Sequence, residues 1–355
     1  MYIMSSSPSN SVGSFFEFLE QATKIPAKKP CFLLGNGISR YMNTAPSWTE
    51  MLNELAKKCA AKNNGADIIL PNLTESPLGK AGMNNPECYT ALLVQLNHKK
   101  SCDTLKKELK NLLGRPGDCG MLNYIRKKEL QVMDTNYDDG LERSLGLRPA
   151  KIPKGGYYSH ARGDFNSENY PFHEYIAAKI SDDLPLEPVA NATKKAKESV
   201  TDHCAVWHVH GNLVHSGTIL LGYEDYISAI IYVRERVLKN ASAANGFAEP
   251  WEEDFKGKNT WLRLFFTRPL VIAGCGLASE ELFLRWLLLR RCRHMLEEKL
   301  EKKIPVYYLA TPPKPEEESA YQNKKLFFEQ LGIQVVEFDD YASLYDAREW
   351  EEVSR

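Results

Sequence analysis

The sequence predicts an α/β protein with a parallel β-sheet, and three observations support this fold class. Short, continuously apolar runs recur along the 355 residues, as expected for strands that are covered on both faces. Several runs end directly in a glycine-rich or polar turn, and stretches of helical periodicity separate them. The clearest segments are CFLLGNGIS (31–39), LQVMDTNYDD (130–139), CAVWHVHGN (204–212) and LVIAGCGL (270–277).

The composition is that of a globular protein, with 43% apolar and 26% charged residues. A net charge of -1 gives no electrostatic footprint for direct binding to nucleic acid or to an anionic membrane. The start of the chain lacks the pattern of a secretory signal, and no apolar run approaches the roughly 20 residues that span a bilayer. We therefore expect a cytoplasmic protein.

The eight cysteines are scattered, and no two of them form a CxxC pair. Structural zinc sites usually contain such close pairs, so the sequence predicts neither a zinc module nor any other metal site. Most of the cysteines stand in apolar or helical settings, which favours buried, reduced thiols.

The first half of the chain predicts one strand followed by helices. A short helix over 15–22 and a linker over 26–30 precede the strand Cys31 to Leu34. Ser47 and Glu50 form a capping box for the next helix, and further helical stretches cover 89–96 and 103–113. We divide the chain into a tail and helix (1–30) and one domain (31–355). Residues of about 47–128 form a mainly helical insertion in that domain, suited to act as a lid.

The second half returns to the sheet after an irregular insertion. Residues of about 146–199 are rich in glycine, proline and lysine, with one helix predicted near 172–180. Strands are then predicted at 205–209, 218–221, 270–273, 306–310 and 334–338, and a long helix begins at Ser279. Alternating strands and helices of this kind are typical of a Rossmann-like parallel sheet.

Candidate site residues follow the strands, because ligands bind outside the carboxyl ends of an open parallel sheet. In the first turn, Gly35, Asn36, Gly37 and Ser39 would let the backbone approach a diphosphate. A simple tight turn is the competing interpretation. After the second strand, Thr135, Asn136 and Asp138 suit a ribose hydroxyl and a carboxamide, or alternatively cap the next helix.

Two later segments add a histidine and a second glycine turn. His210 stands beside Gly211, and His208 precedes it by two residues, so both imidazoles are expected on one face. No further metal ligands stand near the HxH pair in the sequence, which argues against a metal site. The alternative to a functional His210 is a structural histidine that is held by hydrogen bonds. The late turn contributes Gly274, Gly276 and Leu277 before an acidic helix start, which favours adenosine or ribose over a diphosphate.

Taken in order, GNGIS, TNYDD, HVHGN and GCGL resemble the motifs of the sirtuin superfamily. More closely, LLGNGISRYMNTAPSWTEML, TNYDDGLE, HVHGN with ILLGYEDY, and VIAGCGLASEELFLRWLL resemble the sirtuin-like domains of bacterial antiphage NAD hydrolases. The resemblance covers about residues 31–290. It does not extend to the cysteine pairs that hold zinc in sirtuin deacylases, nor to their Pro-Asp-Phe-Arg element, where this chain has Thr44-Ala45-Pro46-Ser47-Trp48.

The resemblance implies roles for individual residues. His210 would be the general base, and Asn136 would position water or the nicotinamide ribose. Asp138 would lie near the nicotinamide carboxamide, and the Gly35–Ser39 turn would lie near the diphosphate of NAD+.

The same resemblance implies an NAD+ glycohydrolase that depletes NAD+ in antiphage defence. Such an activity would need gating by homo-oligomer assembly or by a partner, for which a ring-forming DNA-translocating ATPase is the leading candidate. Two alternatives stay open at this point: an NAD-dependent protein deacylase, and a non-catalytic sensor of NAD or ADP-ribose.

Overall fold

The computed structural model describes the central sheet and most of the helices that cover it. The described residues are 11–25, 28–43, 45–62, 85–95, 117–148, 178–179, 204–211, 219–238, 255, 261–279, 281–298 and 304–354.

A six-stranded, wholly parallel sheet forms the centre of the molecule, in the strand order β5-β2-β1-β6-β7-β8. Its central strands are buried along their whole length, as the continuous apolar runs predict. The predicted strands at 31–34, 270–273 and 306–310 are confirmed, and the strand predicted at 334–338 lies one residue earlier, at 333–337. The strands are β1 (Cys31–Leu34), β2 (Gln131–Asp134), β5 (Ala205–His208), β6 (Leu270–Ala273), β7 (Val306–Ala310) and β8 (Ile333–Glu337).

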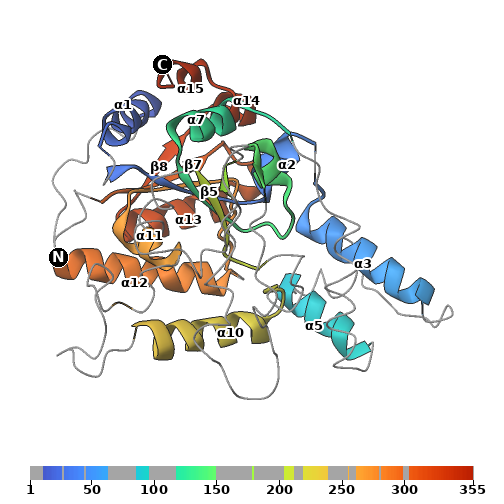
Figure 1. Cartoon of the computed structure of the whole chain (residues 1–355). Helices are drawn as coiled ribbons and strands as arrows, with labels where there is room; N and C mark the ends of the chain where they lie inside the picture. Colours follow the sequence, from blue (N-terminus) through green and yellow to red (C-terminus); the bar gives the residue numbers. More distant parts are fainter. Residues whose placement is uncertain are drawn as a thin grey trace.

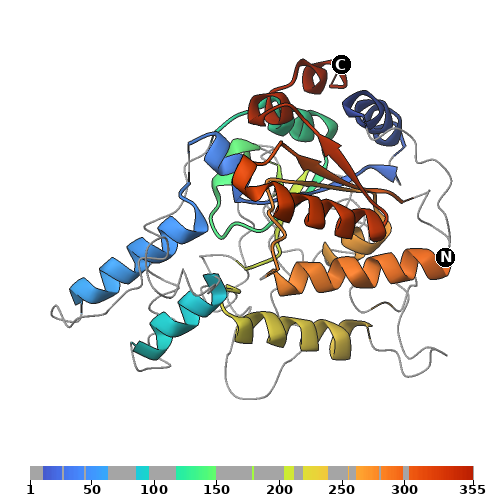
Figure 2. The ribbon, with the colours of Figure 1, turned by 180° about the vertical axis from the view of Figure 1, so that it is seen from behind.

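Helices cover both faces of the sheet, which confirms a Rossmann-like α/β fold (Figures 1 and 2). Each face has its own apolar core: Phe15, Tyr124 and Trp350 belong to one, and Trp261 and Phe283 to the other. The first face carries α1 (Val12–Thr23), α2 (Asn36–Tyr41), α7 (Gly120–Lys128), α8 (Gly140–Ser144), α14 (Tyr341–Tyr345) and α15 (Arg348–Glu352). The second face carries α10 (Tyr223–Tyr232), the π-helix η5 (Val233–Leu238), α11 (Trp261–Thr267), α12 (Leu282–Glu298) and α13 (Glu318–Gln330), which follows the 3-10 turn η6 (Pro315–Glu317).

Two helices project away from the sheet as an arm, seen in both views (Figures 1 and 2). They are α3 (Trp48–Lys62) and α5 (Asn85–Gln95). The predicted capping box at the start of α3 is present, because the Ser47 amide donates to Glu50 Oε2 over 2.6 Å and the Glu50 amide donates to Ser47 Oγ over 3.2 Å. The helix predicted at 103–113 lies outside the described residues.

Two local predictions are wrong. Residues Ala178–Lys179, predicted as the end of a helix, form the short strand β4, which pairs antiparallel with β3 (Leu147–Arg148). Ladder hydrogen bonds to a distant segment override local helical periodicity there. Residues Ile219 to Leu221, predicted as strand, join no sheet, and the Leu220 amide donates instead to the carbonyl of His210 over 2.9 Å.

The residues after β1 form the start of α2 rather than a simple tight turn, and they lie in direct backbone contact with the glycine turn after β6. A Cβ atom on Gly35 would lie 2.5 Å from the carbonyl oxygen of Gly274, and one on Gly37 would lie 2.6 Å from the Cα of Gly274. The Gly37 amide also donates to that carbonyl over 2.8 Å. Gly274 has a φ of +65°, a left-handed conformation that side chains disfavour. The glycines are therefore needed for packing of one turn against the other.

None of the helices in the described part of the chain has both the length and the apolar character needed to cross a membrane.

The backbone contact between Gly37 and Gly274 predicts a clear difference in stability between two glycine-to-alanine substitutions. Gly37→Ala places a methyl group against backbone atoms that cannot rotate away, and we expect a loss of about 1–3 kcal/mol in the free energy of unfolding. Gly276→Ala is the matched control, since its Cβ would have no neighbour within 4 Å. Urea unfolding of both variants measures the difference. Equal stability of the two would contradict the packing of these turns.

Candidate active site

Four parallel strands end at the same level, and this brings the predicted site residues together. In the strand register, Leu34 is paired with Asp134 and with Ala273, and Asp134 is paired in turn with His208. The residues that follow are Gly35, Thr135, Val209 and Gly274, so the four motifs leave the sheet side by side. Segments separated by up to about 240 positions in the sequence thus share one edge of the sheet.

His210 lies just beyond β5 and is buried, with 3% of its surface exposed. A hydrogen bond joins its ring to the backbone of Thr135. Its Nε2 lies 3.5 Å from Glu281 Oε2 and has no hydrogen-bond partner among the described residues. The ring of Tyr226 lies 5.7 Å from the imidazole, centroid to centroid. One nitrogen is thus anchored, and the other is buried without a hydrogen-bond partner among the described residues.

Burial lowers the pKa of His210 to about 4, and the hydrogen bond to Thr135 opposes this only in part. The imidazole is therefore neutral at pH 7 and able to accept a proton. Glu281 is placed to stabilise the imidazolium once it forms, since opposite charges attract strongly where water is excluded.

The wall beside His210 is built from residues that the sequence did not single out. Tyr137 and Tyr226 are both buried, and burial followed by the charge of Glu281 raises the pKa of each hydroxyl. The Tyr137 hydroxyl donates to the Leu220 carbonyl over 2.8 Å. In the sequence, Glu281 stands out only as part of the acidic helix start that favours adenosine or ribose over a diphosphate. A signal for its role was absent, because the facing histidine is 71 positions away.

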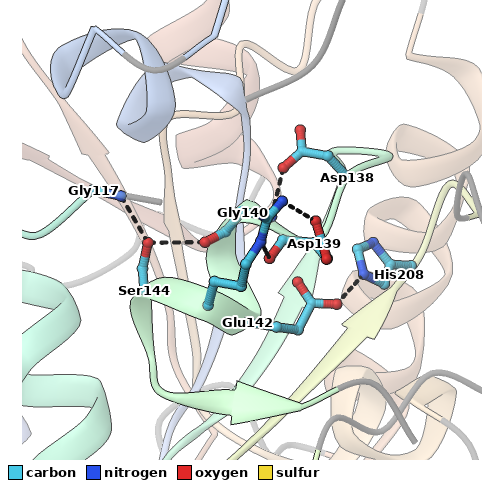
Figure 3. Close-up of polar contacts among 8 residues, drawn as sticks. Gly117, Asp138, Asp139, Gly140, Glu142, Ser144 and His208 are labelled. Atoms are coloured by element: carbon cyan, nitrogen blue, oxygen red, sulfur yellow. Dashed lines mark hydrogen bonds and ion pairs between the residues drawn. The ribbon is translucent and has the colours of Figure 1, made fainter. Parts of the chain in front are cut away.

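Asn136 is half-buried, and its side-chain amide makes no hydrogen bond to another described residue. Its backbone, by contrast, is held firmly: the amide donates to Asp134 Oδ1 over 2.9 Å, and the carbonyl accepts from His208 Nδ1 over 2.9 Å. Asp138 Oδ1 accepts from the Gly140 amide over 2.7 Å at the start of α8, which is the capping alternative for this residue. Asp138 is thus engaged in local structure, and Figure 3 shows its contact with Gly140. The side chain of Asn136 is not engaged in this way by the described residues.

His208 lies in a buried cluster with Asp134 and Glu142, whose ligand-type atoms are all within 4.8 Å of one another. Its Nε2 is 2.5 Å from Glu142 Oε1, as Figure 3 shows. Burial alone would lower the pKa of His208, but the charge and hydrogen bond of Glu142 raise it to about 10. The prediction that His208 and His210 share a face is wrong, because β5 ends at His208 and the chain then turns.

A metal ion in this cluster would need a free lone pair on the imidazole. Both ring nitrogens of His208 already contact protein groups, Nδ1 the carbonyl of Asn136 and Nε2 the carboxylate of Glu142. The cluster therefore fits an ion pair with a buried third carboxyl group better than it fits a metal.

The remaining predicted residues line the same edge with mixed roles. The Asn36 side chain donates to the Pro46 carbonyl over 2.6 Å, so it supports the chain leading into α3. Ser39 is half-buried on α2, and Gly276 is exposed. Gly211 and Leu277 have positive φ values of 86° and 44°, and the carbonyl of Leu277 accepts from Arg285 over 2.9 Å.

A parallel sheet with glycine turns, an open amide and a buried neutral imidazole at its carboxyl edge defines the class of nucleotide-binding α/β domains. A family model described as the SIR2-like domain matches residues 131–336, more than half of the chain. The chain belongs to this family and carries a sirtuin-related, NAD-binding domain. No curated protein matches the chain. The matched region begins at β2, so the Gly35–Ser39 turn precedes it.

The two histidines predict opposite effects of pH on stability. Unfolded histidine titrates near 6.5, so His210 lowers the free energy of unfolding as pH falls from 6.5 towards 4. His208 stabilises the fold below pH 6.5, and that contribution is lost as pH rises towards 10. Urea unfolding from pH 4 to 10 tests both, with His210→Gln and His208→Gln as references. A variant curve parallel to wild type in its window would contradict the assignment.

Proposed function

We propose that this protein is an NAD+ hydrolase, which cleaves the nicotinamide–ribose bond to give nicotinamide and ADP-ribose. The observation that carries this proposal is the neutral, buried His210, whose Nε2 has no hydrogen-bond partner among the described residues and whose ring is anchored on Thr135, the residue before Asn136. The SIR2-like family supports NAD+ as the substrate.

In the proposed reaction, the glycosidic bond breaks and its electron pair passes to the nicotinamide nitrogen, which leaves as a neutral group. A water oxygen attacks the ribose carbon, and His210 takes the proton released from that water. The Asn136 amide orients the water or the ribose without adding charge. Glu281, 3.5 Å from His210 Nε2, stabilises the imidazolium. The glycine turns and Leu277 would contact the rest of the dinucleotide.

The biological role that we propose is depletion of NAD+ during antiphage defence. Unregulated loss of NAD+ would kill the cell, so the activity would be gated by homo-oligomer assembly or by a partner such as a ring-forming DNA-translocating ATPase. The resemblance of the four motifs supports this role.

The reaction is tested with the purified full-length chain, with and without its genomic neighbour, by chromatography of the products formed from NAD+. Free ADP-ribose with nicotinamide is the expected result. Acyl-ADP-ribose formed with an acylated peptide would indicate a deacylase instead. Tight binding of NAD+ without turnover under every condition would indicate a sensor.

His210→Ala and Asn136→Ala should each reduce kcat by about 100-fold or more, the usual contribution of a general base or a positioning group. The melting temperature of each variant checks that it folds, because truncation of the buried His210 ring leaves a cavity. His294→Ala on α12 and Asn123→Ala on α7 are matched controls outside the site. Full activity of the His210 variant would reject it as the base.

Glu281→Gln tests the carboxylate beside His210. Since opposite charges attract strongly where water is excluded, loss of the carboxylate should destabilise the imidazolium, and we expect kcat to fall by roughly 10- to 100-fold. The pKa of His210, followed by NMR, should fall further because an attractive charge is removed. An unchanged kcat together with an unchanged pKa would show that Glu281 does not act on His210.

A further inference from the structure

We infer that Asp134, His208 and Glu142 form a positioning unit that clamps the backbone of Asn136 and thereby presents its side-chain amide to the substrate. The inference rests on the proposed function for the role of that amide. The clamp itself rests only on the geometry of these buried side chains.

The clamp holds Asn136 from two sides. Asp134 Oδ1 accepts from the amide of Asn136, and His208 Nδ1 donates to its carbonyl, each over 2.9 Å. Asp134 ends β2 and His208 ends β5, and the two are direct neighbours in the register. The two groups that grip Asn136 thus come from paired strands, whose separation the sheet fixes.

Glu142 completes the clamp by orienting the imidazole. It lies six residues after Asn136 on α8, and its Oε1 approaches His208 Nε2 to 2.5 Å. Local bonds hold α8 in place: Ser144 Oγ donates to the Gly140 carbonyl over 2.9 Å and accepts from the Gly117 amide over 3.0 Å (Figure 3). The segment from Asn136 to Glu142 is therefore closed into a loop through a single histidine.

Burial of Asp134, His208 and Glu142 costs free energy, because each ionisable group loses its contact with water. Asp134 and Glu142 have no measurable exposure, and one oxygen of each lacks a hydrogen-bond partner in the described part of the chain. Apolar residues would fill the same space without the cost of desolvating three ionisable groups. What such groups supply, and apolar residues do not, is directional hydrogen bonds to the Asn136 backbone.

Two neutral substitutions of His208 separate its two contacts. The side-chain nitrogen of asparagine reaches the position of Nδ1, next to Asn136, whereas that of glutamine reaches the position of Nε2, next to Glu142. Both are made with Glu142→Gln, so that the carboxylate facing Nε2 is not left buried without the imidazole. The Glu142→Gln single variant serves as the reference.

The clamp predicts that H208Q/E142Q, which loses the bond to Asn136, differs from H208N/E142Q, which keeps it. Hydrogen exchange of the 130–140 segment should rise about tenfold or more in H208Q/E142Q and stay within about threefold of the reference in H208N/E142Q. In NAD+ hydrolysis, kcat should fall roughly 10- to 100-fold in H208Q/E142Q, with KM within about threefold. Equal exchange in the two variants would overturn the clamp.

A second measurement applies if H208Q/E142Q does not fold. In ¹⁵N NMR of the wild type at pH 8, the clamp requires a proton on His208 Nδ1, because this nitrogen donates to the carbonyl of Asn136. A ring protonated only at Nε2, or a stoichiometric metal ion in elemental analysis of the purified protein, would overturn it.

The proposed NAD+ hydrolysis and the clamp on Asn136 can be disproved independently of each other. Wild type that never cleaves NAD+, but shows the predicted exchange pattern, would end the proposed function and leave the clamp standing. Wild type that cleaves NAD+, but shows no difference between the variants, would end the clamp alone.

Discussion

The parallel register of β1, β2, β5 and β6 is the constraint on which the rest of the site depends. Their last residues are lateral neighbours, so four turns must leave the sheet at one level. Turns that crowd in this way leave no room for side chains where they touch, and glycine meets that need at the contact of Gly37 with Gly274.

Two histidines separated by a single residue acquire opposite properties from this packing. His208 lies against a carboxylate at 2.5 Å, which outweighs burial and favours the charged ring. His210 lies 3.5 Å from a partly exposed carboxylate, and burial dominates. A charged ring suits a structural donor, and a neutral ring suits a proton acceptor. The turn after β5 thus divides one HxH motif into a supporting group and a reactive one.

The sequence was sufficient for the sheet and for the edge where the site lies, because buried parallel strands and their terminal turns leave a local signal. Residues Cys31 to Leu34 and Leu270 to Ala273 are examples. The sequence did not predict that Glu281 and Glu142 belong to the site, because the histidines that they contact are distant in the chain. A buried glutamate also cannot be told from an exposed one by its residue type. The prediction of a helix at Ala178–Lys179 was wrong for a similar reason, because the strand that pairs with these residues lies about 30 positions earlier in the chain.

The arm formed by α3 and α5 is not independent of the reactive histidine. The ring of Trp48 lies 6.3 Å from that of Tyr137, and the Tyr137 hydroxyl donates to Leu220. Leu220 in turn donates to the carbonyl of His210. A continuous series of contacts therefore joins the start of α3 to the residue that we propose as the base. Because Tyr137 is buried and both of its contacts lie on this route, a displacement of the start of α3 would change the packing that supports His210.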